Sequence, residues 1–218
     1  MDLKTINKLN SGLNILSVES EEFKKYGKIH YVQGFDELER YTLEHYLTPQ
    51  VGNLYIASCK DLESFQIVKD VQKQVYGEME IQAGPCTGHN DVLNGIEYHQ
   101  GSEVTIMIKD SIMILGHIWD MENHFYNSSN CQVFYVPKGT VLETYGTTLH
   151  YTPCAVCKEG FYTICILLKG TGDILKKGRS EILKKKNKWF ITHEENILKV
   201  QEGDFVGLKG KMLKVNTG

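Results

Sequence analysis

The sequence predicts a mainly β protein, a barrel or sandwich of short strands with a few helices near its N-terminus. Two observations lead to this prediction. From Glu78 onward, short runs rich in β-branched and aromatic residues alternate with turn residues, which is typical of all-β folds. Before that point, apolar residues recur at intervals of three and four, as on one face of a helix.

The N-terminal 77 residues have a mixed pattern. Residues 34–47 and 61–77 are expected to be helical, and residues 53–58 are expected to form a strand. In the second helix, Asp61 is the expected N-cap and Gly77 the expected stop. Its apolar stripe consists of Leu62, Phe65, Val68, Val71 and Val75.

The remaining strands are expected after residue 77. They are residues 78–84, 102–108, 111–119, 131–137, 140–146, 148–154 and 161–169. The strands at 102–108 and 111–119 lack polar alternation, so both of their faces should be covered, one by the barrel interior and one by the N-terminal segment.

No linker divides the chain, which predicts one domain over residues 1–218. Within it, we expect residues 1–77 to pack on a barrel formed by residues 78–170, followed by a basic C-terminal segment at 171–218.

Composition excludes several classes of function. The formal net charge of −3 and the isoelectric point near 6.2 argue against a nucleic-acid partner. No apolar run is long enough to cross a membrane and no signal-peptide pattern opens the chain, so we expect a cytoplasmic protein with reduced cysteines. Cys154 and Cys157 form a lone C-x-x-C pair, which has too few ligands for a structural zinc site.

A basic run, "KKGRSEILKKKNK", covers residues 176–188 and holds seven basic residues and one acid. The first interpretation is a solvated surface segment. The second is a positive field that steers an anionic substrate toward the site. The apolar stretch that follows, residues 187–195, is expected to pack back on the body of the protein.

The strongest candidate site is in "GIEYHQGSEVTIMI". Glu97 and His99 are two residues apart and share a face on a strand, and Glu103 opens the next apolar strand. Buried carboxylates and imidazoles are costly unless they are paired or bind a cation, so this grouping indicates a cation between them.

Two segments, "EYHQGSEVTIMIKDSIMI" and "CQVFYVPKG", resemble the two cupin motifs. His99 falls on the second His of the first motif and Glu103 on its Glu. Pro137 and Gly139 fall on the Pro-x-Gly of the second motif. More closely, the run from about Gly84 to Gly172 is similar to a bacterial cupin-like family known mainly as a domain of unknown function. The resemblance implies a cupin double-stranded β-helix, a jelly-roll-like barrel that binds metal and substrate inside.

The chain also departs from the cupin motifs. Glu97 replaces the first His, Asp110 and Cys131 replace the usual turn glycines, and Leu142 stands where the second-motif His is expected. We expect His150, on the next strand-like stretch, to supply the missing imidazole.

The resemblance therefore implies one divalent transition metal (Mn²⁺, Fe²⁺, Zn²⁺ or Ni²⁺) held by His99, Glu103 and His150. Glu97 and Glu143 compete for a fourth ligand position or an acid/base role. We expect Glu143 to be the acid/base, because it follows the position of the missing cupin His. Three further histidines are expected at the rim or surface: His89, His117 and His124.

Three functions are consistent with this ligand set. The first is a metal-dependent isomerase or epimerase of a small carbohydrate, which the spare carboxylate favours. The second is a lyase or Fe²⁺ oxygenase acting on a small hydroxy or amino acid. The third is a sugar-binding cupin without catalysis. In each case the partner is a small molecule rather than a nucleic acid or a membrane, and a homodimer is compatible with the sequence.

Overall fold

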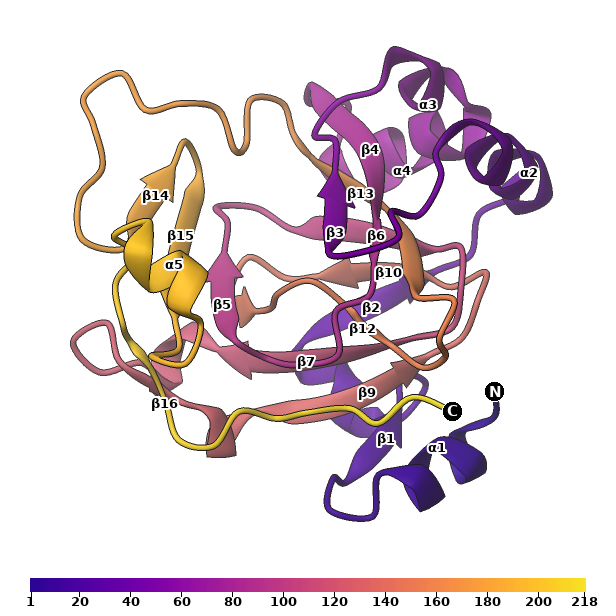
Figure 1. Cartoon of the computed structure of the whole chain (residues 1–218). Helices are drawn as coiled ribbons and strands as arrows, with labels where there is room; N and C mark the ends of the chain where they lie inside the picture. Colours follow the sequence, from indigo (N-terminus) through magenta and orange to yellow (C-terminus); the bar gives the residue numbers. More distant parts are fainter.

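The computed structural model describes all 218 residues and shows two facing β-sheets, with helices on the outer side of one of them (Figure 1). The first sheet has six strands in the order β2-β10-β6-β13-β4-β3. Its strands are β2 (Gly27–His30), β10 (Val141–Thr144), β6 (Glu103–Met107), β13 (Phe161–Leu168), β4 (Ile81–Gly88) and β3 (Asn53–Tyr55).

The second sheet has the order β1-β9-β7-β11, with β12 also paired to β7. Its strands are β1 (Ile15–Ser17), β9 (Gln132–Val136), β7 (Ser111–His117), β11 (Thr148–Leu149) and β12 (Cys154–Ala155). A third sheet joins β14 (Leu183–Lys185), β15 (Lys188–Thr192) and β5 (Gly95–Tyr98). A backbone bridge between Glu97 and His150 connects this third sheet to the end of β11. The prediction of a mainly β barrel is confirmed.

The helices and shorter elements complete the fold. The α-helices are α1 (Leu3–Leu9), α2 (Phe35–His45), α3 (Lys60–Ser64), α4 (Gln66–Tyr76) and α5 (Ile197–Gln201). The 3-10 turns are at Glu21–Lys25, Ile118–Asp120 and Ser128–Asn130, and β16 (Leu208–Lys209) pairs with β8 (Tyr126–Asn127). None of the helices is long and apolar enough to cross a membrane.

Helices α2, α3 and α4 cover the outer face of the first sheet, as the apolar runs predicted. Val104 and Ile106 of β6 are completely buried in a cluster that also contains Leu62, Val68 and Val71 of α3 and α4. The opposite face of β6 points into the barrel. The N-terminal segment also extends the barrel itself, because β1, β2 and β3 pair with β9, β10 and β4.

The prediction of a single helix at 61–77 is wrong in one respect, because the helix is interrupted at Phe65. Phe65 has an extended backbone (ψ 141°) and separates α3 from α4. The Ser64 hydroxyl donates to the backbone carbonyl of Asp61 at 2.6 Å, a local bond that competes with helix propagation. Gly77 ends α4 in the left-handed region as predicted, whereas the N-cap of α3 is Cys59 rather than Asp61.

The strand expected at 148–154 is also interrupted, for a reason that concerns the site. After Leu149 the chain leaves β7, and His150 exchanges two backbone hydrogen bonds with Glu97, at 2.7 and 2.9 Å. The chain returns to β7 only at Cys154. This detour places His150 beside the strand that carries Glu97 and His99.

Candidate metal centre

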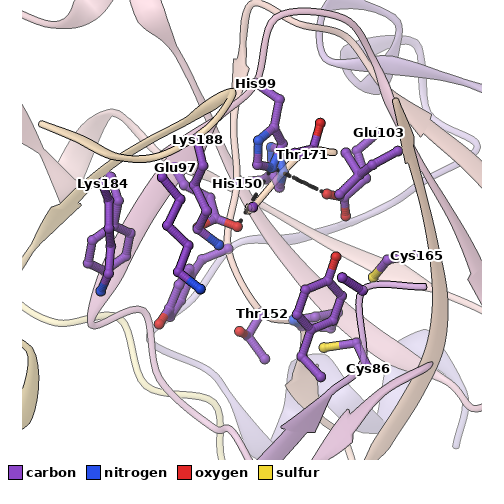
Figure 2. A pocket seen from close by; sticks show the side chains of 18 of the residues that line it. Cys86, Glu97, His99, Glu103, His150, Thr152, Cys165, Thr171, Lys184 and Lys188 are labelled. Atoms are coloured by element: carbon purple, nitrogen blue, oxygen red, sulfur yellow. Dashed lines mark hydrogen bonds and ion pairs between the residues drawn. The ribbon is translucent and has the colours of Figure 1, made fainter. Parts of the chain in front are cut away.

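A cavity of about 480 Å³ opens inside the barrel, and the residues of the first cupin-like motif line it. Glu97, His99, Glu103 and His150 all reach its wall, and all four are at least 90% buried. Figure 2 shows the His99, His150 and Glu103 side chains pointing toward one another, with Glu97 and Lys188 beside them. The structure thus brings together four of the five residues predicted to form the site.

The four side chains form one cluster, and three of them, Glu97, His99 and His150, lie close enough together to hold one ion. Glu103 Oε2 lies 3.3 Å from His150 Nε2 and 3.5 Å from His99 Nε2. On the other side, Glu97 Oε1 lies 3.8 Å from His99 Nε2. One ligand atom each from Glu97, His99 and His150 lies within 4.8 Å of the others.

Hydrogen bonds on the far side of each ring orient both imidazoles. His99 Nδ1 lies 2.8 Å from the backbone carbonyl of Asn187, and His150 Nδ1 lies 3.0 Å from that of Thr148. A carbonyl oxygen can only accept, so each Nδ1 carries the proton and donates it. In a neutral ring, Nε2 then carries a lone pair. His99 Nε2 has no hydrogen-bond partner, and His150 Nε2 lies 3.3 Å from Glu103 Oε2.

Glu103 is fixed by its neighbours. Thr105 donates its hydroxyl to Glu103 Oε1 at 3.3 Å, which leaves Oε2 facing the imidazoles. Burial alone would raise the pKa of the Glu103 carboxyl, but His150 and His99 outweigh burial and hold that pKa well below its usual range. In return, the two nearby carboxylates raise the pKa of His150 against the opposing effect of burial. Glu103 is therefore an anion at neutral pH.

Glu97 forms an ion pair that the sequence did not predict. Lys188 Nζ, from the start of β15, lies 2.5 Å from Glu97 Oε2. Burial opposes the charge on Glu97, but Lys188 and then His99 hold the pKa of the Glu97 carboxyl below its ordinary value. Burial likewise opposes the charge on Lys188, and Glu97 holds its pKa above the usual value. The charged pair lies at the edge of the cluster.

Glu143 does not reach the cavity, which corrects the expected acid/base assignment. On β10, Thr144 is opposite Glu103 and Glu143 is opposite Val104, so Glu143 projects from the outer face of the sheet. There its carboxylate accepts from the Ser102 hydroxyl at 2.6 Å and pairs with His30 Nε2 at 2.7 Å. Glu97 is the remaining candidate for proton transfer.

The other histidines named from the sequence do not line this cavity. His117 is stacked between Tyr26 and Trp119, with ring centroids 4.3 and 4.0 Å away. His124 pairs with Glu181 at the surface, and His89 bonds to the Pro49 carbonyl. Cysteine thiols do reach the cavity, from Cys86 and Cys165.

The residues present fit a divalent transition metal. The side-chain atom His99 Nε2 is buried and has no hydrogen-bond partner, although carboxylate oxygens lie nearby. A neutral Nε2 and a carboxylate oxygen are both acceptors, and a cation between them would satisfy both. His99 and His150 would hold the ion together with a neighbouring carboxylate, Glu103 or Glu97. Such a mixed nitrogen and oxygen set suits Mn²⁺, Fe²⁺, Zn²⁺ or Ni²⁺.

The strand order and the site together define the class of protein. In chain order, the strands of the barrel are β4, β5, β6, β7, β9, β10, β11 and β13. In one sheet the neighbours are β4, β13, β6 and β10. This sheet faces a second one, in which the neighbours are β5, the end of β11, β7 and β9. This is the jelly-roll order of the cupin double-stranded β-helix, here with a candidate metal centre inside. The chain belongs to the family described as "Domain of unknown function (DUF4867)", whose model matches residues 15–213.

No curated protein matches the sequence. Three solved structures show a remote likeness. EvdO2 from Micromonospora carbonacea var. aurantiaca, complexed with 2-oxoglutarate, is 8% identical with a TM-score of 0.39, over 57% of this chain and 67% of that one. A salicylate 1,2-dioxygenase variant from Pseudoaminobacter salicylatoxidans with gentisate is 10% identical (TM-score 0.31; 71% and 34% covered). Vicilin from Corylus avellana is 7% identical (TM-score 0.36; 79% and 46% covered). The match thus spans about a third of the dioxygenase and under half of the vicilin.

Proposed function

We propose that this protein is a metal-dependent isomerase or epimerase that acts on a small sugar or sugar derivative inside the barrel. The observation that carries the proposal is the Glu97–Lys188 ion pair, which lies beside the three candidate ligands and lines the same cavity. A centre that only held a metal would need no further buried carboxylate, since such a group is costly without a role.

The chemistry of an aldose–ketose or epimerase reaction matches these groups. When bound, a divalent metal would act as a Lewis acid that polarises the substrate carbonyl and lowers the cost of an enediolate. Glu97 would accept the proton from the carbon next to the carbonyl and return it to the neighbouring carbon or to the opposite face.

Lys188 supports this role in two ways. Its ammonium group keeps Glu97 ionised in a buried place, so that the carboxylate is ready to accept a proton. Lys188 Nζ has three N–H donors, and those not used by Glu97 can bond to substrate oxygens.

A lyase or Fe²⁺ oxygenase is the second candidate. His99, His150 and Glu103 form a set of two imidazoles and one carboxylate, which also suits O₂ chemistry at Fe²⁺ when ligand positions remain open. In an oxygenase, Glu97 would have no proton-transfer role, whereas a lyase would still need a base. A sugar-binding cupin without catalysis would use the same cavity.

One experiment separates the isomerase, the oxygenase and the sugar-binding protein. The protein, loaded in turn with Mn²⁺, Fe²⁺, Zn²⁺ and Ni²⁺, is incubated in D₂O with a panel of pentoses, hexoses and their acid and phosphate derivatives, and deuterium uptake at the carbons next to the carbonyl is followed by NMR. We expect uptake that Glu97→Gln slows by about 10²- to 10⁴-fold and that Glu143→Gln leaves unchanged. Oxygen consumption with Fe²⁺ and no deuterium uptake would instead support the oxygenase, and binding without either reaction would support the sugar-binding protein.

A further inference from the structure

One wall of the cavity is strongly basic. Lys184 and Lys185 of β14 and Lys188 of β15 line it, and Lys199 of α5 joins them. Figure 2 shows Lys184 and Lys188 on the side of the cavity opposite the thiols of Cys86 and Cys165. Part of the basic run at residues 176–188 therefore faces the cavity.

An irregularity in the β14–β15 hairpin concentrates this charge. Leu183 is opposite Trp189 and Lys185 is opposite Lys188, with a register shift between the two pairs. Successive side chains of a regular strand point to opposite faces, yet Lys184 and Lys185 both line the cavity. Lys185 and Lys188 are also a like-charge pair directly across the hairpin, an arrangement that destabilises a sheet. Such a local cost is expected at a functional site.

A carboxylate of the chain itself shows what this wall can bind. Glu202 Oε1 and Oε2 lie 3.0 and 2.7 Å from Lys199 Nζ, and Oε2 lies 3.3 Å from Lys184 Nζ. Two ammonium groups thus hold a single oxyanion at the cavity. The Glu202 side chain is 41% exposed and comes from the end of a short helix, so it can be displaced.

Lys184 is held in place independently of Glu202. Its ammonium also pairs with the buried carboxylate of Asp204, which Arg179 contacts as well. Its Nζ lies 4.8 Å from the centre of the Phe190 ring. The Lys184 side chain is only 15% exposed, so its charge stays at the wall when Glu202 moves away.

The balance of charges favours an anion. The cavity is lined by four lysines and three glutamates, and two of these glutamates, Glu97 and Glu103, belong to the candidate metal centre. A divalent cation there would make the cavity more positive still. Low-dielectric walls around a net positive charge attract anions and raise their rate of association.

We propose that the substrate carries a terminal oxyanion, a carboxylate or a phosphate monoester, which Lys184, Lys185 and Lys199 bind while the reacting end reaches the centre at His99, Glu103 and His150. The proposal rests on the function proposed above, because it takes this cavity as the substrate site. The Glu202 carboxylate then competes with the substrate for Lys184 and Lys199, and the oxyanion of the substrate displaces it.

Calorimetric titration of the metal-loaded protein tests this inference without requiring turnover. The probes are ribose 5-phosphate against ribose, and glucuronate against glucose, so that phosphate and carboxylate are separate arms. We expect at least one anionic probe to bind about tenfold or more tightly than its neutral partner, and to weaken as salt is added.

Two variants of this basic wall should change the affinity for the anionic probe in opposite directions. Lys199→Met should weaken the anionic probe by about tenfold and leave the neutral sugar unchanged, because a charge-assisted bond is lost. Glu202→Gln should tighten the anionic probe, since the competing charge is removed. Lys24→Met, at an exposed surface ion pair, is the matched control and should change neither. The carboxylate of glucuronate can also bind at the metal, so tighter binding of glucuronate than of glucose does not by itself show binding at the wall. The affinities of Lys199→Met and Glu202→Gln for the anionic probe distinguish the two.

The inference is overturned if anionic and neutral probes bind alike, or if Lys199→Met and Glu202→Gln leave anionic binding unchanged. Its failure is distinct from that of the proposed function. Deuterium uptake into neutral sugars with no preference for anionic ones would retain the isomerase and discard the anion site. Anion binding with the expected variant responses, but no deuterium uptake into any sugar, would retain the anion site and discard the isomerase.

Discussion

His99 donates its Nδ1 proton to the backbone carbonyl of Asn187, 2.8 Å away, and this bond joins the first cupin-like motif to the turn of the β14–β15 hairpin. Asn187 has a left-handed backbone (φ 54°), which its turn requires. Its side chain donates to Gln100 and Thr171 and accepts from the Gln100 backbone. The C-terminal hairpin therefore orients a candidate metal ligand.

This relationship predicts that Asn187→Ala will weaken metal binding by about 10- to 100-fold, as is usual when a partner of a ligating histidine is lost. Alanine disfavours the left-handed conformation and cannot make the three side-chain bonds. Asn187→Gly keeps the backbone conformation and should weaken binding less. Competition between the protein and a chelator for Zn²⁺ measures both, and equal affinity of Asn187→Ala and the unaltered protein would contradict the role assigned to this turn.

Glu97→Gln should slow turnover by about 10²- to 10⁴-fold with metal content unchanged, the usual contribution of a positioned general base. Glu143→Gln makes the same change on the outer face of the sheet and should leave turnover unchanged. Metal analysis and steady-state kinetics of both variants check this. Loss of metal from Glu97→Gln would show that Glu97 is a ligand instead.

His117 predicts a pH dependence of stability that is separate from the metal centre. Burial between Tyr26 and Trp119 lowers the pKa of its imidazole, and His117 Nδ1 has no partner. The unfolded chain therefore binds a proton at a higher pH than the folded chain. Below about pH 6.5, stability should fall with pH until the lowered pKa is passed.

His117→Phe keeps a ring in the stack and should flatten the pH dependence of the unfolding free energy in that window. Denaturant titrations between about pH 5 and 7.5 measure it, with His124→Phe at the exposed surface as the control. An identical slope in His117→Phe and in the unaltered protein would exclude His117 as the source.

The chain is predicted to unfold as one unit over residues 1–218. β2 pairs with β10 and β3 pairs with β4, so removal of residues 1–77 would expose edges of the barrel. Limited proteolysis should therefore give no stable fragment that ends near residue 77. Recovery of a folded 1–77 fragment would show two domains.

The sequence predicted the barrel because strand signals are local. The β-branched runs of β6 and β7 and the turn between them are visible without tertiary information, as is the spacing of His99 and Glu103. Glu143 was misplaced because its face depends on register. A shift of one residue moves a side chain to the other face, and the pairing of Thr144 with Glu103 cannot be seen in the sequence.

Lys188 and Asn187 were missed for a related reason. Their contacts with Glu97 and His99 join segments far apart in the chain, and a lysine in a basic run is usually solvated. The signal available was the proximity of this run to an apolar stretch, residues 187–195, that was expected to pack back on the body. Pairing of β15 with β5 brings the run to the cavity.

The most direct test is a crystal structure of the Mn²⁺-loaded protein with anomalous scattering recorded at a wavelength where manganese scatters strongly. We expect one peak inside the barrel, about 2.0–2.3 Å from His99 Nε2, His150 Nε2 and a Glu103 oxygen, with Glu97 still paired to Lys188. No peak in the barrel at saturating Mn²⁺, or a peak bound by residues other than these three, would contradict the assignment of the metal centre.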